Sequence, residues 1–188
     1  MATSNGQRIG IWVIAVVMTV GTLGAFFLPL IENSNTSKDA LDQQTQLDQA
    51  YAQMRAEAKV NNLPLEGYAA ELFKAADVTA LVKEDLVAGD GAEATRDTKN
   101  TLAYFGWTPD GTIFDSSNKK DGSGQSFGFK PSENGAIQGW VDGVPGMKVG
   151  GVRKLTIPAD QAYGAQGSPP LIDPNTPLVF IMKLEKVE

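Results

Sequence analysis

The sequence feature that most constrains the fold is a succession of short β-type segments between residues 78 and 188, with no long helical segment between them. Apolar residues occupy every second position in the clearest of these segments, which is the period of a strand with one buried face. Turns rich in glycine and aspartate, GDG and TPDG, separate the first segments. Strands that follow one another without a ten-residue helix predict an antiparallel sheet. The expected strands are VTALVKEDLVA (78–88), TLAYFGW (101–107), VRKLTIP (152–158) and LVFIMKLEKV (178–187), and the expected brief helix is QGWVDGV (138–144).

Histidine and cysteine are both absent from the 188 residues. Their absence removes the imidazole base of a Ser-His-Asp triad, a thiolate nucleophile and the usual zinc ligands. We therefore expect no metal and no cofactor, and any catalysis must use carboxylates, hydroxyls, amides and apolar surfaces. The chain carries 16 basic and 22 acidic side chains, a net charge of −6, so no basic field is present to attract nucleic acid.

Residues 9–31 form an uncharged apolar run, IGIWVIAVVMTVGTLGAFFLPLI. As a helix this run would be about 34 Å long, enough to cross a hydrocarbon core of roughly 30 Å. Arg8 precedes the run and Glu32 follows it, so the positive-inside rule places residues 1–8 in the cytoplasm and the rest of the chain outside it. The expected protein is single-pass, with a periplasmic or extracellular domain. A cleaved signal peptide is the alternative, although no A-x-A site follows the run.

Residues 32–77 are expected to be a polar linker and a helical stalk. From residue 38 to 61 the chain lacks glycine and proline, and Leu47, Tyr51, Met54 and Ala58 recur at helical spacing. A solvated stalk helix and a homodimeric coiled coil through residues 38–61 both fit this stripe. The sequence NNLP breaks the helix at 61–64, and a second helical stretch is expected with Tyr68, Leu72 and Ala75 or Ala76 on one face.

Two loops in the C-terminal half are unlike each other. NKKDGSGQS (118–126) is expected to be a flexible, solvated flap, whereas QGSPPLIDPNTP (166–177) carries four prolines together with Leu171 and Ile172. We interpret the second loop as a rigid wall. Aromatic residues occur in or beside almost every predicted element, and each one alone is explained by a hydrophobic core. Together they indicate a shared concavity between the sheet and the short helix. These residues are Tyr104, Phe114, Phe127, Phe129, Trp140, Tyr163 and Phe180.

Three motifs in succession carry a family resemblance: GTIFDSS (111–117), AIQGWVDGVPGMKVGGVRKLTIP (136–158) and AYGAQGSPPLIDPNTPLVF (162–180). In this order the chain resembles the FKBP-type peptidyl-prolyl isomerases over residues 78–188. The resemblance implies an α+β domain in which a curled, five- to six-stranded antiparallel sheet surrounds a short helix, with an apolar pocket between them. In the full chain this domain would follow a transmembrane helix and a helical stalk.

The resemblance also implies roles for individual residues. Ile137 would offer its backbone N–H to a substrate carbonyl, Trp140 would form the pocket floor, and the Tyr163 hydroxyl would hold the bound chain. This sequence departs from the family pattern at Ala136, where valine is usual, and at Ser168, where histidine or another larger residue is frequent; its flap is also longer. The implied catalytic residues are Tyr104, Phe114, Asp115, Tyr163 and Phe180, and the implied substrate-binding residues are Phe127, Ala136, Ile137, Trp140, Leu171 and Ile172.

Rotation about an X–Pro amide breaks no bond, so the missing histidine, thiolate and metal are not needed for isomerisation. The resemblance therefore implies an isomerase that acts on proline-containing polypeptides, assists the folding of exported or membrane proteins, and binds a macrolide. A membrane-tethered chaperone or proline-peptide docking module without turnover is the alternative, and a structural role is a third. For Asp115 we favour a carboxylate that accepts a hydrogen bond from Tyr104 and orients the site, over a metal ligand or a helix cap.

Overall fold

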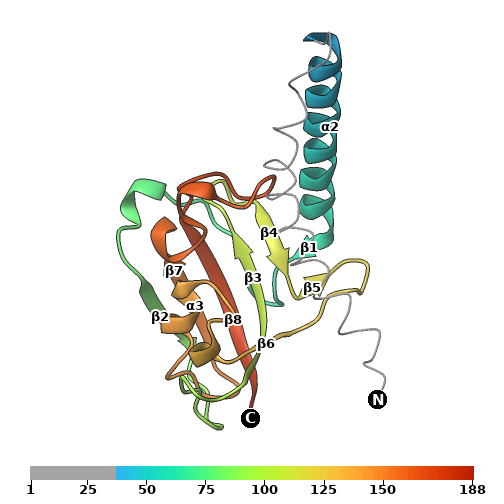
Figure 1. The fold of residues 1–188 in the computed structure, drawn as a ribbon. Coiled ribbons are helices and arrows are strands. Elements are labelled where there is room, and N and C mark those ends of the chain that lie inside the picture. The colour runs from blue at the N-terminus through green and yellow to red at the C-terminus, as the bar shows by residue number, and fades with distance from the viewer. Residues whose placement is uncertain (1–36) are drawn as a thin grey trace, which may run out of the picture.

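The computed structural model describes residues 37–188, so the predicted cytoplasmic residues 1–8 and the predicted membrane-spanning segment 9–31 lie outside the described residues. Among the helices of residues 37–188, none combines the length and the hydrophobicity needed to cross a bilayer. The described chain forms one long helix that projects from a curled sheet, with a second, much shorter helix on the sheet (Figure 1).

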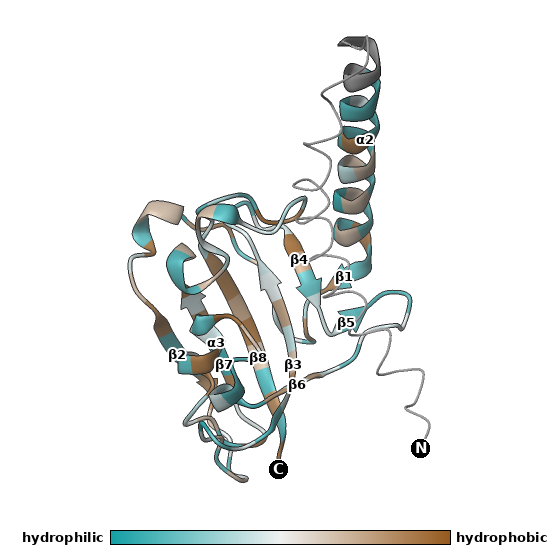
Figure 2. Ribbon diagram, viewed as in Figure 1, coloured by the Kyte–Doolittle hydropathy of each residue, from teal (hydrophilic) through white to brown (hydrophobic). Residues whose placement is uncertain are grey.

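The long helix α2 spans Ser37–Asn61, which confirms the helix predicted for residues 38–61. Its composition of alanine, glutamine, glutamate and lysine suits a helix, and Pro64 prevents its continuation. Tyr51, Met54 and Ala58 are partly buried at helical spacing, while Leu47 higher on the same stripe is 42% exposed. The last turns of α2 therefore contact the sheet domain, whereas residues 42–50 are exposed. Figure 2 shows hydrophilic residues along much of this helix.

The second helical stretch, predicted from the spacing of Tyr68, Leu72 and Ala75 or Ala76, is wrong. The chain turns at Gly67 and forms only one 3-10 turn, η2 Ala75–Asp77, before the sheet begins. Tertiary contacts replace the helical hydrogen bonds: the Trp107 Nε1–H donates to the Glu71 carbonyl at 2.8 Å, and the Phe73 N–H donates to the Pro109 carbonyl at 3.2 Å. The stalk helix consequently ends at Asn61, and the chain that follows it lies on the sheet.

The main sheet is antiparallel and six-stranded, as predicted. Its strand order is β2-β7-β8-β3-β4, and β6 pairs with the beginning of β3. A separate two-stranded ladder joins β1 Asn62–Leu63 to β5 Asn118–Lys119. The six strands are β2 Val82–Val87, β3 Asn100–Trp107, β4 Ile113–Ser116, β6 Phe127–Phe129, β7 Val152–Ile157 and β8 Leu178–Val187.

The short helix α3, Gln138–Gly143, packs on one face of the sheet and matches the predicted segment 138–144. Two glycines allow this close approach. A Cβ atom on Gly139 would lie 2.4 Å from Cγ2 of Ile157, and one on Gly143 would lie 2.5 Å from Cδ1 of Leu155. Separations this short are excluded for real side chains, so the glycines fix the distance between α3 and β7. Three further single 3-10 turns lie in loops: η3 Pro131–Glu133, η4 Ala159–Gln161 and η5 Gly164–Gln166.

Alternate residues of β3 face two hydrophobic clusters, one on each side of the sheet. Leu102 faces the larger cluster between the sheet and α3, whereas Phe105 and Trp107 face the opposite side and stack with ring centroids 5.2 Å apart. Hydrophobic residues line the middle of β8, which contributes to both clusters (Figure 2). The chain after α2 covers the second cluster with Leu65, Tyr68, Ala70 and Phe73. Residues 62–74 therefore pack as part of the sheet domain rather than as part of the stalk.

Candidate active site

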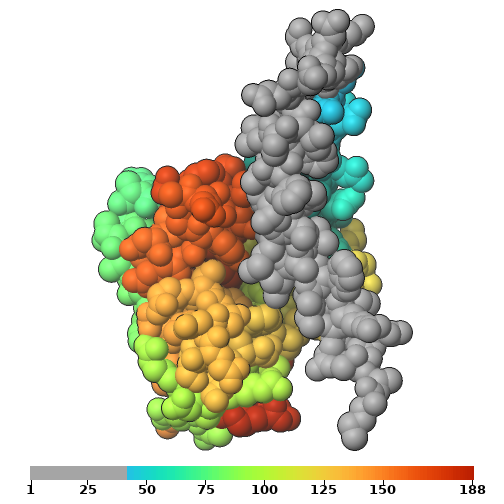
Figure 3. All heavy atoms as spheres, in the orientation of Figure 1, coloured from blue at the N-terminus to red at the C-terminus, as the bar shows by residue number. Residues whose placement is uncertain are grey.

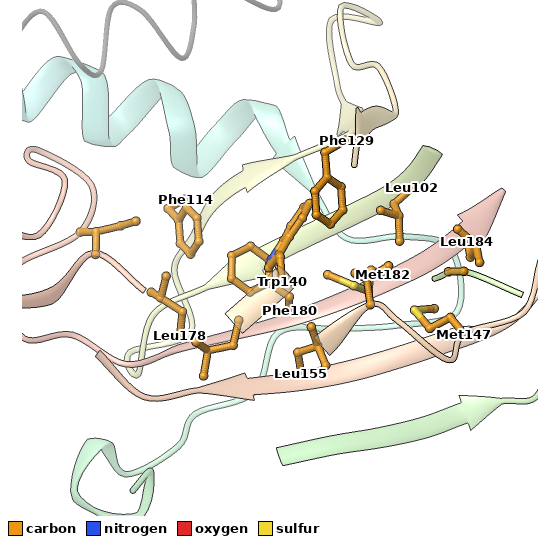
Figure 4. Packing of buried hydrophobic residues seen from close by; sticks show 14 residues of the cluster. Leu102, Phe114, Phe129, Trp140, Met147, Leu155, Leu178, Phe180, Met182 and Leu184 are labelled. Atoms are coloured by element: carbon orange, nitrogen blue, oxygen red, sulfur yellow. The ribbon is translucent and has the colours of Figure 1, made fainter. Parts of the chain in front are cut away.

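Trp140 lies at the centre of an aromatic group between α3 and the sheet (Figure 4). It is 5% exposed, and its ring lies 5.1 Å from Tyr104, 5.8 Å from Phe127 and 5.2 Å from Phe180, each at 75–84°. Such edge-to-face contacts are the preferred geometry of aromatic pairs. Phe129 approaches at 5.8 Å and 56°. We call the following six residues the aromatic site: Tyr104, Phe114, Phe127, Phe129, Trp140 and Phe180.

Phe114 joins the aromatic site through Phe180, with centroids 5.5 Å apart and planes at 87°. Gly106 of β3 lies beneath this pair, because a Cβ there would meet the Phe180 ring at 2.4 Å and the Phe114 ring at 2.8 Å. The rest of the predicted apolar wall surrounds the same cluster. Ile172 is buried, and Ala136, Ile137 and Leu171 are partly buried and pack against it.

Ile137 immediately precedes α3 and has an extended backbone (φ −61°, ψ 151°). Its carbonyl accepts from the Trp140 N–H at 2.9 Å, but its own N–H has no acceptor within residues 37–188. The buried Trp140 Nε1–H likewise has no acceptor within that part of the chain. Buried donors are nearly always paired in native proteins, so the unpaired indole N–H of Trp140 is available to an acceptor on a bound molecule.

Asp115 lies in β4 opposite Gly106 of β3, so the helix-cap interpretation is wrong. Its Oδ2 accepts a hydrogen bond from the Tyr104 hydroxyl at 2.5 Å, which confirms the predicted contact. Its Oδ1 accepts from the Ser116 N–H and from Lys119 Nζ, both at 2.8 Å. Three donors thus fix the orientation of this carboxylate. Within residues 37–188 no group of acidic side chains is arranged to hold a metal ion.

The surroundings of Tyr104 favour its neutral hydroxyl. Burial, followed by the charge of Asp115 and the hydrogen bond to it, raises the pKa of Tyr104 well above its ordinary value of 10.0. Tyr163 follows η4 and is 39% exposed, yet the protein around it still desolvates its phenol. That desolvation and the charge of Asp115 raise the pKa of Tyr163. Both phenols therefore remain hydrogen-bond donors at neutral pH.

The end of α2 and the strand β1 that follows it hold the flap and the proline-rich loop. Lys120–Ser123 are exposed, as expected of a solvated flap, but β5 at the start of the flap pairs with β1. On the other side, Arg55 Nε donates to the Pro170 carbonyl at 2.5 Å. The loop is also closed by its own bonds, since the Ser168 and Ile172 N–H groups each donate to the other's carbonyl at 2.8 and 3.0 Å. Figure 3 shows this loop and the α3 segment adjoining on one face.

Sequence reasoning missed three residues of this region. Phe129 is absent from the predicted site residues, although its two-residue spacing from Phe127 places both rings on one side of β6. Lys119 lies in the predicted flap and has no predicted role, although it supplies the cation next to Asp115. Asn62 carries no local signal, because its partner Lys119 is 57 residues away.

Comparison with known proteins identifies the domain that contains this site. The profile of the family described as FKBP-type peptidyl-prolyl cis-trans isomerase matches residues 91–185. A relative from Neisseria meningitidis serogroup A, named FK506-binding protein, is 42% identical over 108 residues, covering 57% of this chain and 96% of the relative. FK506-binding protein 4 of Rhizopus delemar is 43% identical over 104 residues, which are 55% of this chain but only 26% of that longer protein.

Solved structures agree with these sequence matches. The peptidyl-prolyl cis-trans isomerase of Pseudomonas syringae pv. tomato has a TM-score of 0.51 and 29% identity, and the match covers 83% of this chain and 98% of that one. AtFKBP13 has a TM-score of 0.52 and 31% identity over 57% of this chain and 93% of its own. The family match contains every residue of the aromatic site together with Asp115 and Tyr163. This chain therefore belongs to the FKBP-type peptidyl-prolyl cis-trans isomerases.

Proposed function

We propose that the aromatic site binds the proline of a polypeptide substrate and promotes rotation about the preceding amide bond. The observation that carries this proposal is Trp140, which is buried among four aromatic rings and whose own Nε1–H, like the neighbouring Ile137 N–H, lacks an acceptor within the described residues. Trp140 would lie under the proline ring, with Tyr104, Phe114 and Phe180 as walls. Phe127, Ala136, Leu171 and Ile172 would bound the neighbouring substrate residues.

The amide resists rotation with a barrier of roughly 18–20 kcal/mol because twisting removes its resonance. Water stabilises the planar, charge-separated amide, so an apolar surface favours the less polar twisted state. The N–H of Ile137 and the hydroxyl of Tyr163 would hold the substrate on either side of the bond, and Asp115 would fix Tyr104 and set the local polarity. An acceleration of ~10⁵ requires about 7 kcal/mol of preferential stabilisation of the transition state.

A protease-coupled assay on a prolyl tetrapeptide tests this function in the full chain. We expect acceleration by the wild type and a large loss of kcat/KM in Asp115→Val with the fold retained. A full chain that binds prolyl peptides without accelerating their isomerisation would instead support the alternative function of a tethered chaperone or docking module. An Asp115→Val enzyme with full activity would refute the role given to this carboxylate.

The macrolide proposal rests on the relatives named FK506-binding protein and on the apolar character of the aromatic site. An apolar ligand that fills the site must compete with the prolyl peptide. Ala136 and Ser168 are smaller than the residues usual in the family, so contacts at these two positions are reduced. Inhibition of the assay by FK506 measures the affinity, and restoring bulk with Ala136→Val is expected to strengthen inhibition.

The proposed location is extracytoplasmic, with substrates among exported or membrane proteins. The support is the uncharged run 9–31 and the charges that flank it. N-terminal sequencing of the protein from a membrane fraction tests retention of this segment; a chain that begins after residue 31 would contradict the anchor. Accessibility of the isomerase domain to protease in intact cells or spheroplasts then tests its side of the membrane.

A homodimer through residues 38–61 is proposed on the exposure of α2. Every residue from 42 to 50 is exposed, so this part of the helix is accessible to a second copy. Sedimentation equilibrium of the detergent-solubilised full chain measures the oligomeric state. A Leu47→Glu change on the exposed stripe is expected to favour the monomer, and a wild type that remains monomeric at high concentration would exclude the dimer.

A further inference from the structure

The segment that follows α2 is joined to the flap by a dense set of hydrogen bonds. In the β1–β5 ladder Asn62 pairs with Lys119 and Leu63 pairs with Asn118. The Leu63 carbonyl also accepts from the Ser116 hydroxyl at 2.6 Å. Leu63 and Asn62 lie outside residues 91–185, where the isomerase family matches. Residues beyond the family domain therefore contact the strand that carries Asp115.

Asn62 uses both ends of its side chain in these contacts. It is 6% exposed; its Nδ2 donates to the Ile113 carbonyl at 3.1 Å, and its Oδ1 accepts from Lys119 Nζ at 2.5 Å. The bond to Ile113 fixes the amide in the orientation that presents its oxygen to Lys119. A buried asparagine with both ends bonded has a defined direction, unlike a surface amide that exchanges partners with water.

The contact continues from Asn62 into the aromatic site. The same Lys119 Nζ lies 2.8 Å from Asp115 Oδ1, and Asp115 Oδ2 accepts from the Tyr104 hydroxyl at 2.5 Å. The Tyr104 ring in turn meets the edge of Trp140 at 5.1 Å. An unbroken sequence of polar contacts thus connects the end of the stalk helix to the ring that faces Trp140.

We propose that Asn62 is a positioning residue for the isomerase reaction, which holds the Lys119 ammonium against Asp115 and so fixes the direction of the Tyr104 hydroxyl and ring. The proposal rests on the roles given above to Tyr104 and Asp115. A lysine ammonium is a point charge on a flexible four-carbon stem, and one acceptor alone confines it poorly. Asn62 supplies a second acceptor, and charge-assisted hydrogen bonds of this kind are about twice as strong as neutral ones.

The neighbouring asparagine provides a matched control. Asn61 also bonds the flap through its side chain, because its Nδ2 donates to Asp121 Oδ2 at 3.0 Å and its Oδ1 accepts from the Asp121 N–H at 3.1 Å. That side chain makes no hydrogen bond to Lys119 or Asp115. Asn61→Ala therefore removes a flap tether of the same kind and leaves the contacts to Asp115 in place.

The experiment measures kcat/KM on a prolyl peptide for full-chain variants, with thermal unfolding in parallel. Asn62→Ala is expected to lower kcat/KM about tenfold, because Lys119 and, through Asp115, the Tyr104 hydroxyl lose their fixed direction, while Asn61→Ala stays within about twofold of the wild type. Equal losses in the two variants would mean that Asn62 only tethers the flap, and would overturn the proposal.

A double-mutant cycle separates positioning through Lys119 from a general structural effect. Lys119→Met is expected to lose at least as much kcat/KM as Asn62→Ala, and Asn62→Ala should cost nothing further in the Lys119→Met background. Fully additive losses would overturn the proposal. A Lys119→Met enzyme with wild-type kcat/KM would overturn it as well, even if Asn62→Ala fails to fold.

The same variants distinguish a failure of the role proposed for Asn62 from a failure of the role proposed for Asp115. If Asp115→Val loses activity while Asn62→Ala and Lys119→Met keep it, only the positioning role fails. If Asp115→Val is fully active, the role of the carboxylate fails first and the positioning role fails with it. The expected order of kcat/KM is wild type and Asn61→Ala highest, then Asn62→Ala, then Asp115→Val.

Discussion

A Cβ atom on Gly106 would lie 2.4 Å from Cε1 of Phe180, so strand β3 has no room for any side chain at this position. The rings of Phe180 and Phe114 occupy this space as an edge-to-face pair. The absence of a side chain on β3 is thus what lets the two rings meet above the sheet.

Gly106→Ala is expected to displace the Phe180 ring, reduce the free energy of unfolding by about 1–3 kcal/mol and lower kcat/KM. Gly128→Ala in β6 is the control, because its Cβ would meet nothing closer than 3.7 Å. Urea unfolding and the prolyl-peptide assay compare the two variants. Equal stability of Gly106→Ala and Gly128→Ala would contradict the packing described for β3.

Substitutions of the two tryptophans on opposite sides of the sheet are expected to have similar effects on stability and different effects on catalysis. Trp140 belongs to the aromatic site, whereas Trp107 is 1% exposed on the far side and donates to the Glu71 carbonyl. Trp140→Leu and Trp107→Leu should each reduce the free energy of unfolding by about 2–4 kcal/mol. Only Trp140→Leu should lower kcat per folded molecule; a similar loss in Trp107→Leu would remove the distinction between the two faces.

Arg153 is expected to give the protein an acid-sensitive contact. This residue is 6% exposed and binds Asp85 through Nε at 2.6 Å and Nη2 at 3.0 Å, while its Nη1 donates to the Gly143 carbonyl at the end of α3. The hydrogen bond from Arg153 lowers the pKa of Asp85 below 3.8. The ionised carboxylate therefore stabilises the fold above pH ~4, and this stabilisation is lost as the pH falls through the folded-state pKa.

Asp85→Asn is expected to reduce the free energy of unfolding by about 1–2 kcal/mol at pH 7, a value limited by the 56% exposure of the Asp85 side chain. The loss should shrink as the pH falls below 4 and vanish below the lowered folded-state pKa, where the wild-type carboxyl is protonated. Glu84→Gln, on the opposite face of the same strand, is the control. A pH-independent difference between Asp85→Asn and the wild type would argue against the ion pair.

Tyrosine ionisation is expected to destabilise the fold at high pH. Because the pKa of Tyr104 is raised above 10.0 in the folded state, its neutral form adds stability that is complete below pH 10 and is lost as the pH rises through the folded-state pKa. A spectrophotometric titration should show late ionisation of both Tyr104 and Tyr163, and the Tyr104→Phe variant should lose the latest part of it. Retention of the full late component in Tyr104→Phe would show that another tyrosine carries it.

The sheet and the short helix could be predicted because their signals are local. The alternation in LVFIMKLEKV matches β8, and the glycine spacing around Trp140 matches a helix that must approach the sheet closely. The local sequence carries no sign that the helix expected around Tyr68 is wrong. Its apolar spacing fits a helix, but Tyr68 and Phe73 pack on the far face of the sheet, whose position depends on strands much later in the chain.

The aromatic site could be predicted from local signals, whereas the contact between Asn62 and Lys119 could not. Trp140 and Phe180 are marked by their type and by the motifs around them. The contact between Asn62 and Lys119 depends on two strands of only two residues each, which are too short to show any period. Polar contacts between such distant, short segments arise only when the whole domain has fixed their positions.

The sheet order has a consequence for biosynthesis. Strand β8, residues 178–187, lies between β7 and β3 and pairs with both, so the middle of the sheet is completed by the segment that is translated after all the others. Until that segment emerges from the ribosome, β3 and β7 have no partner between them and their apolar faces stay open to solvent. The sheet of this domain is therefore expected to close only after residues 178–187 have been translated, rather than strand by strand during translation.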